Sequence, residues 1–279
     1  MNINILSVDW DYFFPNAAHY DWGHKEEPIF FETLWPIRWS NYNMRTDLRG
    51  QKGHQARSHF IVSADRLNNF WHKLFGPGRI DPPEYLVITE SHKDLYEVVT
   101  SLKFKKSDVV KIWNYDAHHD MGYGASAQPM VPACDNWAKL LLDEWKISGY
   151  RLIYPEWRRH EPEDKFPSGA TYRLVYPEFG QRVMDYYSDE QQVMPMPAYF
   201  NVVFACRSSA WTPSWYDHLW IEFIEYWKHK DMQLWHTKMS CEYALKARPF
   251  DIDQAKQLEK QMTEWREQNG KKDSKSNIG

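Results

Sequence analysis

Three short apolar runs in this chain are each followed at once by aspartate or histidine side chains. The runs cover residues 3–8, 85–89 and 109–113, and each has the length and composition of a buried β-strand. The polar residues that follow them are, in chain order, Asp9, Asp11, His92, Asp116, His118 and Asp120. Residues two apart in an extended chain share a face. If the runs are parallel strands, their carboxyl ends meet at one edge of a sheet, so we expect these six side chains to converge there.

Strand-like and helix-like segments alternate along most of the chain, which predicts an α/β protein. Further strands are expected at 150–154, 172–176 and 199–205, and helices at 63–75, 92–102, 134–147 and 214–230. Such alternation favours three layers, α/β/α, with a mostly parallel sheet covered on both faces. Ligands of such sheets bind beyond the carboxyl ends of the strands.

The length of 279 residues allows one large domain, which we place at residues 1–250. Residues 15–59 are aromatic and polar without a clear period, so we interpret them as an insertion or lid over a binding site. Residues 251–279 are expected to form a C-terminal helix and a disordered tail that begins at Lys271. The helix carries an apolar stripe expected to pack on the domain, formed by Ile252, Ala255, Leu258, Met262 and Trp265.

Composition excludes several classes of protein. A net charge of −4 lacks the dense basic face that nucleic-acid phosphates require. No apolar run reaches the roughly 20 residues of a membrane helix, and no signal peptide is recognisable. Three scattered cysteines without a CxxC pair are typical of a reducing compartment. We therefore expect a cytoplasmic protein without nucleic-acid or membrane partners; the sequence does not indicate its oligomeric state.

The six expected ligands predict a divalent metal site. Like charges as close as Asp9 and Asp11 are costly unless a cation lies between them. Carboxylate oxygens and imidazoles suit Mn²⁺, and four carboxylates exceed the need of one open catalytic ion. The sequence therefore predicts a pair of ions that share carboxylates.

Two motifs resemble those of the arginase and deacetylase superfamily. The segment Asp116-Ala117-His118-His119-Asp120 resembles its DAHxD motif, and Ser7-Val8-Asp9-Trp10-Asp11 resembles its SxDxD motif. Shorter pieces resemble the branch that includes the peptide arginases: Tyr12-Phe13-Phe14, Glu90-Ser91-His92, Asp135-Asn136-Trp137 and Tyr154-Pro155-Glu156-Trp157. The resemblance consists of motifs scattered over about residues 3–215.

This resemblance implies an arginase-like fold and a manganese enzyme that acts on a ribosomally made precursor peptide. Arginine side chains would be hydrolysed to ornithine and urea by hydroxide formed at two Mn²⁺ ions per chain. Asp9 and Asp116 would bridge the ions. His92 and Asp120 would complete one site, and Asp11 and His118 the other.

The resemblance also suggests catalytic and substrate-binding residues. Asp120 would hold or shuttle a proton. A guanidinium needs planar carboxylate partners, and the nearest in motif terms are Glu90 and Asp135, with Glu156 as a third.

Two departures from the free-arginine arginases leave alternatives open. The SxDxD motif precedes DAHxD here instead of following it, and the loop with their catalytic histidine has no clear counterpart. The alternatives are a ureohydrolase or deacetylase acting on free arginine, agmatine or an acyl-amine, and a non-catalytic peptide-binding module.

Overall fold

A computed structural model describes the chain at residues 1–14, 35–36, 64–75, 83–102, 108–122, 131–155, 172–175, 183–187, 197–227, 233–235 and 241–276. Its elements are β1 (Asn2–Asp9), η1 (Trp10–Phe13), α3 (Ala64–Phe75), β2 (Tyr85–Thr89), α4 (Asp94–Ser101), β3 (Val109–Tyr115), α5 (Trp137–Asp143), β4 (Gly149–Ile153), β5 (Tyr172–Val175), β6 (Val183–Tyr187), β7 (Val202–Cys206), η4 (Ser214–Tyr216), α6 (Asp217–Glu225), β8 (Gln233–Trp235), α7 (Cys241–Ala244) and α8 (Ile252–Ser276).

The strands form one sheet in the order β5-β6-β4-β3-β1-β7-β2-β8. Neighbouring strands from β4 to β8 in this order are all parallel. Strand β6 pairs antiparallel with β4, and β5 pairs antiparallel with β6. The predicted α/β fold with a mostly parallel sheet is therefore confirmed. The strand expected at 172–176 is present as β5 at one edge of the sheet, whereas β6 and β8 were not predicted.

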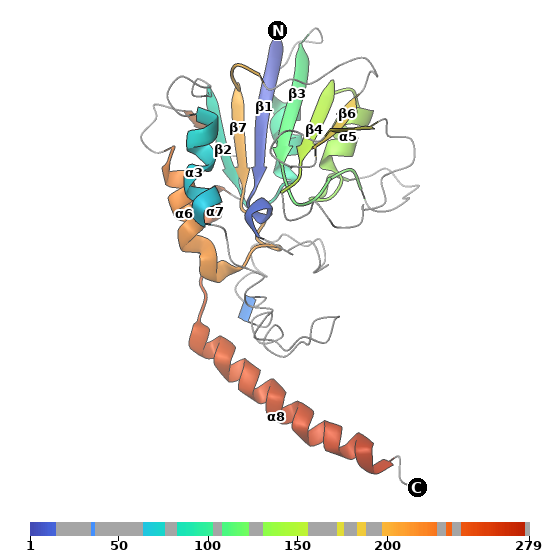
Figure 1. The fold of residues 1–279 in the computed structure, drawn as a ribbon, viewed down its shortest axis with the longest axis vertical. Coiled ribbons are helices and arrows are strands. Elements are labelled where there is room, and N and C mark those ends of the chain that lie inside the picture. Colours follow the sequence, from blue (N-terminus) through green and yellow to red (C-terminus); the bar gives the residue numbers. More distant parts are fainter. Residues whose placement is uncertain are drawn as a thin grey trace.

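Strand β1 lies inside the sheet and buries side chains on both of its faces (Figure 1). Ile3 and Ile5 belong to one hydrophobic cluster, and Leu6 and Val8 belong to the other. The apolar run thus follows the period of two of an extended chain, with a covered sheet on either side.

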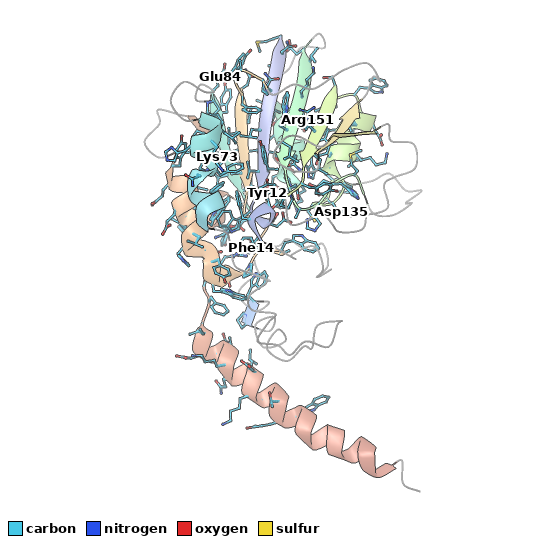
Figure 2. All side chains as sticks on the ribbon, in the orientation of Figure 1. Tyr12, Phe14, Lys73, Glu84, Asp135 and Arg151 are labelled. Atoms are coloured by element: carbon cyan, nitrogen blue, oxygen red, sulfur yellow. The ribbon has the colours of Figure 1, made fainter. Side chains whose placement is uncertain are left out.

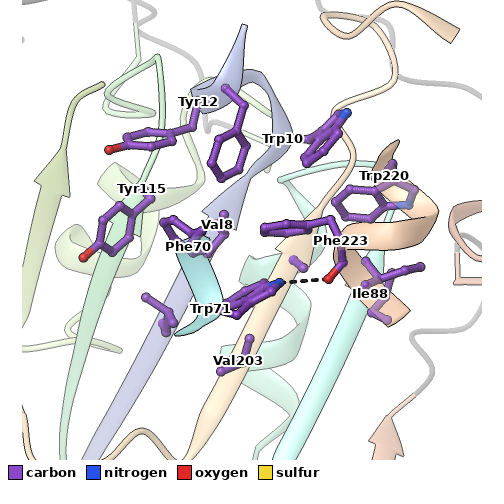
Figure 3. Packing of buried hydrophobic residues seen from close by; sticks show 14 of the residues in the cluster. Val8, Trp10, Tyr12, Phe70, Trp71, Ile88, Tyr115, Val203, Trp220 and Phe223 are labelled. Carbon is purple, nitrogen blue, oxygen red and sulfur yellow. Dashed lines mark hydrogen bonds between the residues drawn. The ribbon is translucent and has the colours of Figure 1, made fainter. Parts of the chain in front are cut away.

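One face of the sheet is covered by α3 and α6 through an aromatic core (Figure 3). Phe70 of α3 meets Tyr115 of β3 edge to face, with 5.1 Å between ring centroids. The Trp71 indole N–H donates to the Phe223 carbonyl at 2.9 Å, which joins α3 to α6. Such aromatic pairs contribute about 0.5–1.5 kcal/mol each beyond the area they bury. Among the described residues, seven tryptophans are buried in this core.

The opposite face is covered by α4 and α5. Leu95 and Val98 of α4 and Trp137 and Leu141 of α5 pack in the second cluster, together with Ile5 of β1. The helices therefore lie in two layers on either side of the sheet, as expected for an α/β/α protein.

The order of the strands reverses beside β1. The chain leaves β1 through α3 to β2 on one side, and then returns through α4 to β3 on the other side. Because α3 and α4 cover opposite faces, β1 marks a topological switch point. The crevice beyond the carboxyl ends of the strands at such a point is the usual ligand site of an open parallel sheet.

The C-terminal helix α8 projects away from the sheet, beyond the edge where β1 ends (Figure 1). Of the expected apolar stripe, Ala255 is buried, but Ile252 is 43% exposed and Trp265 is 65% exposed. The helix also continues to Ser276, past the expected start of the disordered tail at Lys271. Among the stripe residues whose side chains the structure describes, Ala255 is buried and Leu258 is half-buried, whereas the expected packing on the domain is not met by Ile252 and Trp265.

The expected insertion at residues 15–59 lies outside the described residues except for Trp35 and Pro36. Trp35 is fully buried, and its indole N–H donates to the Ser209 carbonyl at 2.9 Å. Its ring also meets that of Trp215 edge to face, at 5.5 Å. This part of the insertion is therefore anchored on the segment that follows β7.

Candidate metal centre

The register of the sheet brings the ends of four strands into one row. Asp9 of β1 is level with Cys206 of β7, which is level with Thr89 of β2. Tyr115 of β3 pairs with Val8, so the residue after it, Asp116, emerges beside Asp9. The carboxyl ends of these parallel strands therefore deliver their polar residues to one place.

Asp9, His92 and Asp116 come close enough to hold one metal ion, and we call them the first ligand group. His92 Nδ1 lies 3.1 Å from Asp9 Oδ2 and 3.0 Å from Asp116 Oδ2. Asp120 Oδ2 is also 3.0 Å from the same nitrogen, so Asp120 adjoins this group. All four residues are buried.

Asp11, Asp116 and His118 form the second ligand group. His118 Nδ1 lies 2.7 Å from Asp11 Oδ2 and 3.8 Å from Asp116 Oδ1. Asp116 therefore belongs to both groups and turns one oxygen toward each. Asp9 belongs to the first group alone, so its expected role as a second bridge stays a prediction.

The donor atoms fit metal ions better than they fit one another. Asp11 Oδ2 and His92 Nδ1 are buried and make no hydrogen bond of good geometry to any described residue, although both lie at ion-pair distance from charged partners. A proton on Nδ1 can point to only one of the three carboxylates around it, whereas a cation attracts all of them. Carboxylate oxygens and imidazole nitrogens are common ligands of divalent metal ions in proteins.

Burial and mutual repulsion shift the pKa values of the carboxyl groups. Burial, followed by the charge of Asp9, raises the pKa of Asp11 to about 7. Burial and the charge of Asp116 raise the pKa of Asp120 well above its usual range. Burial also opposes ionisation of Asp116, but hydrogen bonding and charge from His92 outweigh it and hold the pKa of Asp116 at about 2. Without metal, the cluster keeps protons that bound ions would displace.

The protonation of His92 follows the same logic. Burial alone would lower its pKa, but the carboxylates of Asp116 and Asp120, each 3.0 Å from Nδ1, raise it well above its usual value. The other ring nitrogen, Nε2, lies 2.7 Å from the Ser7 hydroxyl. With Nε2–H donating to Ser7, Nδ1 keeps its lone pair for a metal, which is the tautomer that a ligand histidine requires.

Two further side chains orient the ligand carboxylates. The Trp137 indole N–H donates to Asp120 Oδ2 at 2.6 Å, and the Asn114 amide donates to Asp116 Oδ2 at 2.9 Å. Asp120 itself adopts a left-handed backbone conformation with φ of 53°. Outer contacts of this kind fix the rotamers of metal ligands.

The centre is most open at His118. Its side chain is 16% exposed, whereas those of Asp11 and Asp116 are fully buried. The ring of Trp211 lies beside it, with 4.8 Å between centroids. Of the six expected ligands, His118 is therefore the one closest to solvent within the described part of the chain.

Glu90, expected to bind a substrate guanidinium, binds a guanidinium of the protein instead. Its carboxylate accepts hydrogen bonds from Arg207 Nε at 3.2 Å, from Arg207 Nη2 and from the Ser209 hydroxyl. Glu90 is only 1% exposed. A catalytic or substrate-binding role of Glu90 stays a prediction, and these contacts give its carboxylate a structural role.

Arg207 and Arg248 complete what we call the ionic cluster, with Glu90 and Asp217. Arg207 Nη1 donates to Asp217 Oδ2 at 2.8 Å, and Arg248 Nη2 donates to Asp217 Oδ1 at 2.5 Å. All four side chains are buried. This cluster was not predicted from the sequence, because the only indication of it there is an arginine, Arg207, shortly after a predicted strand.

Asp135 and Glu156 are the other two residues expected to bind the substrate. Asp135 is half-buried and lies at the same end of the sheet as Tyr12 (Figure 2). The Asp135 carbonyl accepts a hydrogen bond from the Gly122 N–H at 2.7 Å. Gly122 has a φ of 80°, in the left-handed region that glycine adopts readily. The Asp135 carboxylate makes no hydrogen bond within the described part of the chain. Glu156 lies outside the described residues, so both substrate roles stay predictions.

Comparisons with protein-family models, with curated proteins and with solved structures give no match to this chain. Of the helices that the structure describes, none combines the length and the apolar character needed to cross a membrane. The function therefore has to be inferred from the geometry of the centre and from the sequence motifs.

Proposed function

We propose that this chain is a manganese-dependent hydrolase that converts arginine side chains of a precursor peptide to ornithine and urea. The observation that carries the proposal is the shared carboxylate of Asp116, which turns one oxygen toward each ligand group. Two adjacent groups joined by a carboxylate are the arrangement that a pair of ions requires. The arginase-like motifs at the same residues supply the class of reaction.

The residues that would hold the ions follow from the two groups. Asp9, His92 and Asp116, with Asp120 beside them, would hold one ion, and Asp11, Asp116 and His118 the other. When bound, a pair of Mn²⁺ ions supplies the Lewis acidity that makes water nucleophilic near neutral pH.

The protein side chains would position the substrate and handle protons. The half-buried carboxylate of Asp135 is available to pair with a guanidinium, in contrast to that of Glu90. Asp120 adjoins the first ligand group and its carboxylate is held by the Trp137 indole, so it is placed to take up a proton and pass it to the leaving amine. The opening at His118 would admit the end of a side chain while the rest of the peptide stays outside.

The test compares substrates at equal concentration with Mn²⁺ present. We expect arginine within a precursor peptide to release urea much faster than free L-arginine, because remote contacts with the peptide position the guanidinium. Mass spectrometry of a co-expressed precursor should show loss of the mass of cyanamide for each converted arginine.

The same assays separate the other functions. Equal or faster turnover of free arginine would contradict the peptide substrate, and agmatine as best substrate would indicate an agmatinase-like ureohydrolase. Elemental analysis that saturates at one ion per chain would contradict the paired centre and favour a deacetylase-like site.

A further inference from the structure

Ser208 occupies an unusual backbone position beside the metal centre. It follows β7 by two residues, is 1% exposed and has a φ of 48°. Residues other than glycine rarely adopt this left-handed conformation, and buried examples persist where the surroundings hold them.

The conformation brings the Ser208 hydroxyl to a ligand of the first group. Ser208 Oγ donates to Asp9 Oδ2 at 2.5 Å, the same oxygen that faces His92 Nδ1 at 3.1 Å. The other oxygen, Asp9 Oδ1, accepts from the Asp11 N–H at 3.0 Å. The two hydrogen bonds together fix the plane of the Asp9 carboxylate.

The segment that carries Ser208 is held from several sides. The Ser208 N–H lies 3.2 Å from Cys206 Sγ, and the Ser208 carbonyl accepts from the Trp211 N–H at 2.8 Å. The carbonyl of the next residue, Ser209, accepts from the Trp35 indole and from Arg248. The hydroxyl therefore has little freedom to leave Asp9.

We propose that Ser208 is a positioning residue that presents Asp9 to the ion of the first ligand group. The inference rests on the proposed paired metal centre and adds a residue that follows β7, a strand after which no ligand lies. A hydroxyl that donates to a ligand carboxylate leaves the second lone pair of that oxygen directed at the ion and keeps the rotamer fixed. Loss of such an outer contact typically weakens metal binding by about 10–100-fold.

The experiment measures Mn²⁺ affinity by calorimetry and the coupling of the two ions by electron paramagnetic resonance. Ser208→Ala removes the hydroxyl, and Ser208→Gly removes it while easing the left-handed backbone. Both should weaken Mn²⁺ binding by about 10–100-fold, and Ser208→Gly should be thermally no less stable than Ser208→Ala. Ser214→Ala is the matched control, because Ser214 is buried six residues later and its hydroxyl contacts no ligand.

Two backgrounds assign the effect to one ligand group. With His118→Ala, the remaining ion reports on the first group, and Ser208→Ala should still weaken it. With His92→Ala, the ion in the second group should be unaffected by Ser208→Ala. A general structural defect would weaken both.

Three results would overturn the proposal. Ser208 variants that bind Mn²⁺ as tightly as Ser214→Ala would show that the hydroxyl has no role while the metal centre stands. If Ser208→Ala weakens Mn²⁺ binding and Ser208→Gly does not, the effect comes from the backbone conformation and not from the hydroxyl. Failure of the unmodified protein to bind Mn²⁺ would refute the metal centre itself and the role of Ser208 with it.

Discussion

Two buried charged clusters lie side by side in this protein, and they differ in how their charge is balanced. The ionic cluster pairs two carboxylates, Glu90 and Asp217, with two guanidiniums, Arg207 and Arg248, so its formal charge is −2 + 2 = 0. The metal centre has four carboxylates and only two imidazoles to offset them. Buried charge alone therefore does not indicate a metal site. What indicates one is an excess of buried carboxylates over the cationic side chains that could balance them.

The hydrogen bonds show the same difference. In the ionic cluster, every carboxylate oxygen accepts from a guanidinium, a hydroxyl or a backbone N–H. In the metal centre, Asp11 Oδ2 and His92 Nδ1 make no well-aligned hydrogen bond to a described residue. The ionic cluster is complete without a ligand, whereas the candidate metal centre keeps donor atoms that could bind a cation.

The largest effect is expected from removing the carboxylate that both ligand groups share. Asp116→Asn should reduce bound Mn²⁺ from two ions to none, because each ion loses a charged ligand. His118→Ala, which touches one group, should leave one ion. Elemental analysis after dialysis measures both, and retention of one ion by Asp116→Asn would show that the groups do not depend on a common bridge.

Arg207→Met should break the balance of the ionic cluster and destabilise the fold by about 3–5 kcal/mol, because Glu90 is left buried without its partner. Replacing Glu90 and Arg207 together by methionine should recover much of that loss, since a buried pair is often replaceable by apolar side chains. Denaturant unfolding of the metal-free protein measures both.

Lys246→Met is the control for this experiment, because Lys246 pairs with Glu242 on the surface, where solvent screens the charges and the pair contributes little to stability. If Arg207→Met costs no more than Lys246→Met, the ionic cluster does not stabilise the fold.

The contrast between the clusters also shows what the sequence could predict. The ligands were predictable because each follows a strand, and parallel strands bring their carboxyl ends to one edge. Arg207 was not, since its partners are the residue after β2, the first residue of α6 and the segment after α7, and only tertiary packing joins them. Glu90 was assigned to a substrate because its own guanidinium partner lies 117 residues later in the chain.

Helix α8 illustrates another limit of prediction from sequence. Its apolar stripe has helical spacing, which predicts a helix correctly but does not reveal whether a neighbour covers it. Ile252 and Trp265 are exposed although their spacing matches that of a packed face. Periodicity therefore identifies a helix, but whether another part of the protein covers its apolar side depends on the tertiary structure.

A smaller effect is expected at Asp135, the remaining described candidate for guanidinium recognition. Asp135→Asn keeps the shape but removes the charge, and should cost about 1.5–3 kcal/mol in transition-state stabilisation. Metal content should be unchanged, because Asp135 belongs to neither ligand group. Urea release under subsaturating peptide measures the loss; full activity would place guanidinium recognition elsewhere.

The stability of the fold should also depend on pH in a way that separates the metal-free from the metal-loaded protein. In the metal-free fold, burial and the charge of Asp9 raise the pKa of Asp11 to about 7, above its usual value of 3.8. The folded state then keeps a proton that the unfolded state releases, so this stability is present at low pH and lost as pH rises toward 7. The slope for one such proton is about 1.4 kcal/mol per pH unit.

The raised pKa values of Asp120 and His92 act in the same direction. The lowered pKa of Asp116 acts in the opposite direction, but only below its usual range, outside this interval. Bound Mn²⁺ replaces the protons, and its binding becomes tighter as pH rises. The metal-loaded protein should therefore not lose stability over this pH range. Urea unfolding from about pH 5 to pH 7, with EDTA and with Mn²⁺, makes the comparison. A decline of equal slope in both would mean that the titrating groups lie outside the metal centre and that its excess negative charge is already balanced within the protein.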